Sequence, residues 1–186
     1  MIISPRELLD MALMTLAVGY IFMILFIPRE LRGHFNWRAL WFACLVTAPA
    51  LILHELSHKF VAMSFGLDAT FHAAYLFLGI GVLLRLAHSP FIFFVPAYVA
   101  IGCARLPCAI SPVDSAIIAF AGPAINLALF VISWAVLKYH RIRKRQWFAF
   151  WLITKRINLL LFILNMLPLP GFDGWKVYTG LLHAFF

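Results

Sequence analysis

Two histidines and a glutamate stand together in an otherwise apolar part of the sequence. The segment His54-Glu55-Leu56-Ser57-His58 lies within a run, from about residue 39 to about residue 65, that is almost wholly apolar. On a helix, residues four apart lie on one face, so both imidazoles could reach one metal ion with the Glu55 carboxylate beside them. Ionisable groups in a segment of membrane length are costly unless they are paired or ligated. The pattern predicts a metal site with a further partner elsewhere; two core histidines beside a satisfied glutamate are the alternative.

Asp173 is the expected partner of these two histidines. It is the only acidic residue after Asp114, and it follows Pro168 and Pro170, which should end an apolar helix. We expect Asp173 in an irregular segment at membrane depth, and such segments persist only where they are buried in protein or line water. The sequence therefore predicts that this carboxylate meets both imidazoles.

The composition is that of an all-α integral membrane protein. Of the 186 residues, 65% are hydrophobic and 12% are charged, whereas about a quarter of the residues of a soluble domain are charged. The chain has room for a polytopic bundle of about four to six membrane segments in a single membrane-embedded domain, residues 1–186. The net charge of +8 comes from cations between apolar runs, as expected of loops that face lipid headgroups. We therefore expect the lipid bilayer as a partner, and no nucleic acid.

Four long helices are expected to position the site. A capping residue followed by a proline and an acid marks two helix starts, at Ser4-Pro5-Arg6-Glu7 and at Ser111-Pro112-Val113-Asp114. About 20 helical residues cross about 30 Å of hydrocarbon. The expected membrane helices cover about residues 8–27, 39–65, 112–137 and 147–167, and a short apolar helix follows Asp173.

The segment from residue 68 to residue 101 is apolar but interrupted. Its apolar runs are broken by glycines, prolines and polar residues: Gly79, Gly81, Arg85, His88, Pro90 and Pro96. We expect a membrane hairpin or re-entrant element that ends in a strand over about residues 95–102, where Tyr98, Val99 and Ile101 favour extended backbone. One ordinary membrane span with a kink is the alternative.

A Gly-Pro pair and a buried amide stand within the third expected helix, as Gly122-Pro123-Ala124-Ile125-Asn126. The small residues permit close packing against a neighbouring helix. Pro123 leaves the main-chain oxygen of Ala119 without its helical donor. The motif is consistent either with helix packing or with a role of Asn126 at the site.

Together, three motifs resemble the site-2 protease family of intramembrane zinc metalloproteases (peptidase family M50), most closely small prokaryotic members without fused domains. The motifs are the His54–His58 segment, then Gly122-Pro123 with Asn126, then Asn165-Met166-Leu167-Pro168-Leu169-Pro170-Gly171-Phe172-Asp173-Gly174. The match covers most of residues 54–176, with Phe172 where the family has leucine. The strand over residues 95–102 resembles a subset of small prokaryotic members, with Pro96-Ala97 where Pro-Gly is usual.

The resemblance implies a function for each motif. His54, His58 and Asp173 would hold Zn²⁺ with one open position, and Glu55 would be the general base for cleavage of a transmembrane protein substrate. Asn165 matches the family's asparagine that contacts substrate or the developing oxyanion, and Asn126 is a second candidate for substrate binding. The protein would be a multi-pass protein of a prokaryotic cell membrane. A non-catalytic binding or transport protein that uses the same polar cluster is the alternative.

Other polar residues are expected to have ordinary roles, and the orientation in the membrane stays open. Lys59 is expected to extend its ammonium group to the membrane surface, and His72 has no predicted partner. If residues 68–101 form a hairpin, the arginines of residues 29–38 share a membrane face with the basic residues 138–145. The positive-inside rule would then place that face in the cytoplasm and the metal site nearer the outside, whereas family members have the site nearer the cytoplasm.

Overall fold

A computed structural model describes residues 2–27, 35–89, 95–103 and 110–185. The chain forms two compact units, which are described separately below. The first comprises Met1–Ile52 and Phe71–Tyr98, and the second comprises Leu53–Thr70 and Val99–Phe186.

Four of the helices are long and apolar enough to cross a membrane, as an all-α polytopic membrane protein requires. Six α-helices lie in the described residues, with bounds α1 Pro5–Met23, α2 Trp37–Ser64, α3 Tyr75–Leu86, α4 Pro112–Tyr139, α5 Arg145–Asn165 and α6 Asp173–Phe185. The candidate spans are α1 with the 3₁₀ turn η1 (Ile24–Phe26), α2, α4 and α5. The four membrane helices predicted from the sequence are thus confirmed.

Both predicted helix starts are present. Ser4 and Glu7 form a capping box, in which the Ser4 main-chain N–H donates to Glu7 Oε2 over 2.7 Å and the Glu7 N–H donates to Ser4 Oγ over 3.3 Å. At the start of α4, the N–H of Asp114 donates to Ser111 Oγ over 3.0 Å. These caps satisfy main-chain donors that the first turn of a helix leaves unpaired.

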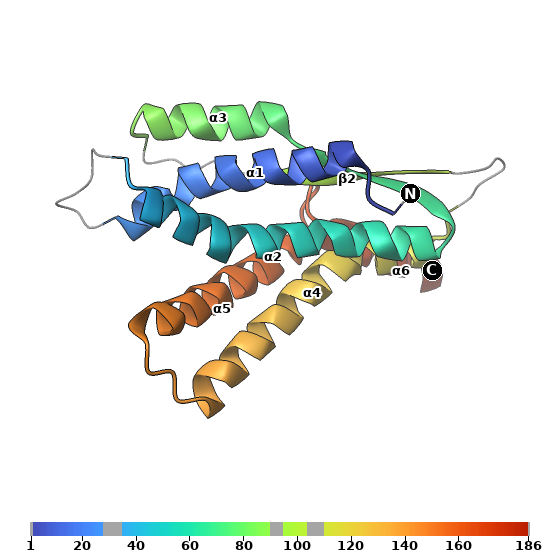
Figure 1. The fold of residues 1–186 in the computed structure, drawn as a ribbon. Helices are drawn as coiled ribbons and strands as arrows, with labels where there is room; N and C mark the ends of the chain where they lie inside the picture. Colours follow the sequence, from blue (N-terminus) through green and yellow to red (C-terminus); the bar gives the residue numbers. More distant parts are fainter. Residues whose placement is uncertain (1, 28–34, 90–94, 104–109, 186) are drawn as a thin grey trace. The chain divides into compact units, whose positions relative to one another are not determined.

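In the first unit, α1 packs against α3 and against the first half of α2 (Figure 1). The two helices α1 and α2 lie close together at Gly19 of α1, where an added Cβ would lie 2.2 Å from Cys44 Sγ of α2. A small buried cluster continues this contact toward the end of α1 and includes Met23, Leu40 and Ala43. Glycine is therefore needed at position 19 for the two helices to come together.

The segment predicted as a hairpin is a strand, a short helix and a second strand. Strand β1 (Leu67–Ala73) precedes α3, and strand β2 (Ala97–Cys103) follows it. The predicted strand over residues 95–102 is confirmed by β2, whereas β1 was not predicted. The 12 residues of α3 span about 18 Å at 1.5 Å per residue, too short for hydrocarbon of about 30 Å. The single kinked span is therefore wrong; residues 90–94 of the expected hairpin lie outside the described residues.

The two strands form one antiparallel sheet, with the end of β1 beside the start of β2. The N–H of Ala74 donates to the main-chain oxygen of Pro96 over 3.0 Å. The rings of His72 and Tyr98 lie 5.5 Å apart between their centroids, as cross-strand neighbours do. The N–H groups of the even-numbered residues at the end of β1 therefore face β2, and those of the odd-numbered residues face away from it.

Two carboxylates of α1 occupy the edge of β1 that faces away from β2. The N–H of Phe71 donates to Glu7 Oε1 over 2.8 Å, and the N–H of Ala73 donates to Asp10 Oδ2 over 3.1 Å. Both carboxylates are buried. Asp10 also accepts a hydrogen bond from the Tyr75 hydroxyl. These acids satisfy main-chain donors that would otherwise be buried without a partner.

His72, for which the sequence indicated no partner, faces one of these acids. Its Nδ1 lies 3.9 Å from Asp10 Oδ2. This contact depends on the packing of β1 against α1, which the sequence alone did not indicate.

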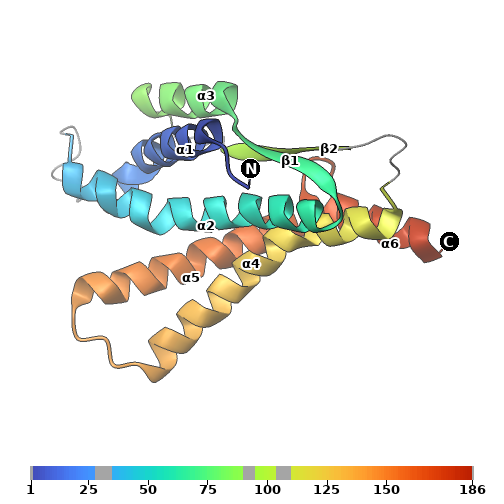
Figure 2. The same ribbon diagram turned by 45° about the vertical axis from the view of Figure 1, so that its right-hand side comes forward.

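In the second unit, α4 and α5 run antiparallel as a helical hairpin, and α6 packs along the first half of α4 (Figures 1 and 2). Helix α5 exposes apolar side chains along much of its length, including Leu160 and Ile163. Such a surface suits lipid rather than water. Lys59 of α2 is only 2% exposed, so the prediction that its ammonium group extends to the membrane surface is wrong.

Candidate metal centre

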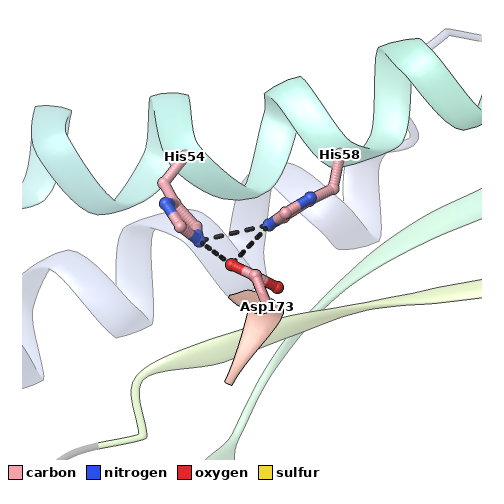
Figure 3. A group of neighbouring side chains, drawn as sticks. All are labelled: His54, His58 and Asp173. Carbon is pink, nitrogen blue, oxygen red and sulfur yellow. Dashed lines mark hydrogen bonds and ion pairs between the residues drawn. The ribbon is translucent and has the colours of Figure 1, made fainter. Parts of the chain in front are cut away.

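Three side chains converge on one point in the second unit. Nε2 of His54 lies 3.1 Å from Asp173 Oδ2, and Nε2 of His58 lies 3.3 Å from the same oxygen. The two Nε2 atoms are 3.1 Å apart. Figure 3 shows both imidazoles pointing from consecutive turns of α2 toward the carboxylate at the start of α6. The predicted meeting of Asp173 with the two histidines is therefore present.

Hydrogen bonds on the far side of each imidazole determine which nitrogen carries the proton. Nδ1 of His58 lies 2.7 Å from the main-chain oxygen of Ile118, and Nδ1 of His54 lies 2.5 Å from Oδ1 of Asn126. Oxygens of this kind only accept, so each Nδ1 must donate its proton. In a neutral imidazole the other nitrogen, Nε2, then presents a lone pair. Both Nε2 atoms therefore face the carboxylate as acceptors.

This arrangement fits a bound cation. Asp173 Oδ2 is buried and has no hydrogen-bond donor among the described residues. Two nitrogen lone pairs and a carboxylate oxygen within 3.3 Å of one another repel unless a positive charge lies between them. Tetrahedral Zn²⁺ with ligand bonds of about 2.0–2.2 Å would place its ligand atoms about 3.3–3.5 Å apart. The donor types and their separations thus match three ligands of a zinc site.

Gly122 of α4 provides the space that the two imidazoles occupy. A Cβ at this position would lie 2.3 Å from Nε2 of His58 and 2.7 Å from Nε2 of His54. Both contacts are far shorter than van der Waals distance. The close packing predicted for the Gly-Pro motif is therefore packing of α4 against the ligand side chains themselves.

Asp173 owes its position to the packing of α6. An added Cβ at Gly174 would lie 2.6 Å from the main-chain carbon of Met166, and one at Gly180 would lie 2.5 Å from the main-chain oxygen of Pro112. The Tyr178 hydroxyl donates to the Met166 oxygen over 3.0 Å. The expectation that Asp173 lies within an irregular segment is corrected, because that segment ends at Phe172 and Asp173 is the first residue of α6.

The other predicted site residues have different surroundings. Glu55 follows His54 directly on α2, is partly exposed, and makes no hydrogen bond or salt bridge to the described part of the chain. Asn165 is the last residue of α5 and is half-buried. Asn126 is fully buried, and its Oδ1 accepts a hydrogen bond from Nδ1 of His54. The catalytic role of Glu55 and the substrate contacts of the two asparagines stay predictions.

Sequence reasoning missed two groups behind the ligands. The Ile118 oxygen belongs to the main chain, so no side-chain pattern could indicate it. Asn158 of α5 donates into its own helix and accepts from Asn126 over 2.8 Å. An amide in the middle of an apolar helix was the available signal for Asn158, because a buried polar group needs a partner.

Comparison with known proteins identifies relatives across most of the chain. Over 176 residues it is 31% identical to Putative zinc metalloprotease MJ0611 of Methanocaldococcus jannaschii, covering 94% of this chain and 84% of that protein. Over 148 residues it is 27% identical to Putative zinc metalloprotease YwhC of Bacillus subtilis, covering 70% of this chain and 64% of that protein. No protein-family model matches the chain, and no solved structure matches it. At this identity and coverage, the chain belongs to the same zinc metalloprotease family as the Methanocaldococcus protein.

Proposed function

We propose that this protein is an intramembrane zinc metalloendopeptidase of the site-2 protease type, which cleaves transmembrane segments of other membrane proteins. The observation that carries the proposal is the convergence of Asp173, at the start of α6, with His54 and His58 of α2, a helix of membrane-spanning length. Membership of a zinc metalloprotease family supports the choice of Zn²⁺ and of peptide hydrolysis.

Different residues of the chain have different roles in the proposed hydrolysis. Zn²⁺ held by His54, His58 and Asp173 would supply Lewis acidity to a peptide carbonyl and would lower the pKa of water. Glu55 accepts a proton from the attacking water and passes it to the amide nitrogen as the carbon–nitrogen bond breaks and a carbon–oxygen bond forms. Glu55 makes no hydrogen bond or salt bridge to the described residues, so its carboxylate keeps its acceptor capacity for a water molecule. Asn165 would donate its amide to substrate or to the developing oxyanion.

The sheet offers one edge for an unwound substrate. A transmembrane helix hides its carbonyls in hydrogen bonds, so it must become extended before attack. The N–H groups of Phe71 and Ala73 at the far edge of β1 are already bound by Glu7 and Asp10, which leaves the outer edge of β2 for an added strand. Val99 of β2 packs against the same small cluster as Ile118, whose oxygen orients His58. We propose that substrate pairs with β2 there.

The same proposal implies a membrane location and a set of partners for the protein. The protein would lie in the bilayer of a prokaryotic cell membrane as a multi-pass protein, with lipid against the exposed apolar side chains of its helices. Its partners would be transmembrane protein substrates and lipid, and not nucleic acid.

Zinc content and cleavage, measured together, test the function. The purified protein in detergent or liposomes should contain stoichiometric zinc and cleave a model peptide that spans the membrane. Glu55→Gln should keep the zinc and lose about 10²–10⁴-fold in cleavage rate, the usual contribution of a general base. Ser57→Ala is the matched control, because the Ser57 hydroxyl donates to the Leu53 main-chain oxygen of its own helix and to no other described residue.

Three results would contradict the proposal. The first is purified protein without metal, and the second is cleavage that survives Glu55→Gln. The third concerns the substrate: equal or faster cleavage of water-soluble peptides, with the membrane-spanning peptide left intact, would leave a zinc protease but not an intramembrane one.

A further inference from the structure

Behind His54 runs a chain of hydrogen bonds that ends on a third helix. Nδ1 of His54 donates to Asn126 Oδ1, Nδ2 of Asn126 donates to Asn158 Oδ1 over 2.8 Å, and Nδ2 of Asn158 donates to the main-chain oxygen of Thr154 over 2.8 Å. The links come from α2, α4 and α5, and both asparagine side chains are 0% exposed.

The Thr154 main-chain oxygen, the last acceptor, fixes the donor-to-acceptor direction of every hydrogen bond in this series. The Thr154 oxygen can only accept, so Asn158 must turn its amide nitrogen toward it and its oxygen toward Asn126. Asn126 must then turn its nitrogen toward Asn158 and its oxygen toward His54. His54 can satisfy that oxygen only with a proton on Nδ1. Nε2 is thereby left with its lone pair directed at Asp173.

We propose that Asn158 is a positioning residue of the metal site: through Asn126 it sets the proton position and the orientation of His54 as a metal ligand. This inference rests on the proposed metal function. Groups that hydrogen-bond to the far nitrogen of a ligating histidine fix its ring and raise its basicity, and their loss typically costs about 10–100-fold in metal affinity. Asn158 contacts Asn126 and does not touch the ligand atoms themselves.

Removal of Asn158 takes away the acceptor that draws the Asn126 amide nitrogen away from His54. That nitrogen can then turn toward His54. A nitrogen donor facing Nδ1 requires the proton on Nε2, and a protonated Nε2 cannot bind a metal. Water cannot easily replace the missing partner, because the side chain is fully buried. His58 is unaffected, because it donates to the main-chain oxygen of Ile118.

Packing alone could also account for the pair, because buried asparagines stabilise contacts between membrane helices. The two roles predict different results. A residue that only packs changes the unfolding temperature of the metal-free protein and leaves metal affinity alone. A positioning residue changes metal affinity, and the change depends on what stands at position 126.

The test measures zinc affinity by competition with a chromophoric chelator, and the visible spectrum of the Co²⁺-loaded protein, in purified variants of the full chain. Asn158→Leu should weaken zinc binding by about 10–100-fold and alter the Co²⁺ spectrum. Asn126→Asp in the same chain should remove most of this loss, because a carboxylate offers His54 an acceptor without help from Asn158. If Asn158→Leu does not fold, Asn158→Ser takes its place, because its short side chain cannot reach both partners.

Two controls separate the chain of hydrogen bonds from general effects of buried polar groups. Thr154→Val removes a buried hydroxyl that has no partner among the described residues and keeps the main-chain acceptor. Ser133→Ala removes a buried hydroxyl of α4 whose one partner in the described part of the chain is the Leu129 oxygen of the same helix. Both should leave zinc affinity unchanged.

The inference fails if folded Asn158→Leu or Asn158→Ser binds zinc as tightly as the native protein with the same Co²⁺ spectrum. It fails also if Asn126→Asp does not reduce the loss. The proposed function fails separately, if the native protein binds no metal at all.

Discussion

Gly122 lies so close to His58 that a single methyl group on it would reach to 2.3 Å from the Nε2 atom that faces Asp173. Helix α4 supplies no ligand, yet it determines the space in which both ligand imidazoles lie. Any side chain at position 122 must displace them or move the helix.

Gly122→Ala should therefore disrupt the site. Because the methyl group meets both imidazoles, we expect loss of zinc affinity and a fall of about 100-fold in cleavage, the effect of moving a reacting group by about 1 Å. Gly79→Ala is the matched control, because a Cβ at Gly79 of α3 has nothing within 4 Å. That change should leave zinc unaffected and stabilise the helix by about 0.5–1 kcal/mol. Equal zinc affinity in both variants would contradict the close contact.

Removal of the carboxylate ligand should uncouple stability from zinc. With zinc at about 1,000 times its dissociation constant, binding adds about 4 kcal/mol to the free energy of unfolding. Added zinc should therefore raise the thermal unfolding temperature of the native protein, and chelator should reverse the effect. Asp173→Asn should show neither response, whereas Asp68→Asn, at an exposed acid of β1, should behave as the native protein. A zinc-dependent shift of native size in Asp173→Asn would remove Asp173 from the ligand set.

Zinc binding should also depend on a glycine distant from the ligands in sequence. Gly180→Ala places a Cβ 2.5 Å from the Pro112 main-chain oxygen and pushes α6, with Asp173 at its start, away from α4. We expect weaker zinc binding measured by chelator competition, and a lower unfolding temperature. Leu182→Ala, at an exposed position of the same helix, is the control. Unchanged zinc affinity in Gly180→Ala would show that the Asp173 carboxylate is placed by the turn before α6 instead.

The acids of α1 should matter for stability and not for the metal. Asp10→Ala leaves the Ala73 N–H without its acceptor, and a buried donor without a partner costs about 1–3 kcal/mol. We expect a lower unfolding temperature with unchanged zinc affinity, because Asp10 contacts no ligand. Tyr75→Phe removes only the hydroxyl that donates to Asp10 and should cost less. An unchanged unfolding temperature in Asp10→Ala would show that another group satisfies the Ala73 N–H.

Much of the site could be predicted because its geometry is local or its candidates are few. The helical period places His54 and His58 on one face whatever surrounds them. Asp173 is the one acid after Asp114, so the choice of a partner there was narrow. Strand β2 is rich in residues that favour extended backbone, and its prediction needed no tertiary contact.

The parts that could not be predicted depend on contacts between segments far apart in the sequence. Strand β1 is anchored by Glu7 and Asp10, more than 60 positions earlier in the chain. The burial of Lys59 and the role of Asn158 likewise follow from helix packing. Hydrophobicity gave the right number of long helices but not which of their polar side chains meet.

The two histidines differ in what a mutation can reach. Nδ1 of His58 donates to the main-chain oxygen of Ile118. A substitution at position 118 that leaves the helix intact keeps this oxygen in place. The proton of His54 is held through two side chains, each of which a single codon change can replace. Natural or laboratory selection could therefore adjust the metal affinity of this centre by substituting the side chains behind His54. The hydrogen bond of His58 depends on the main chain and stays as long as the fold does.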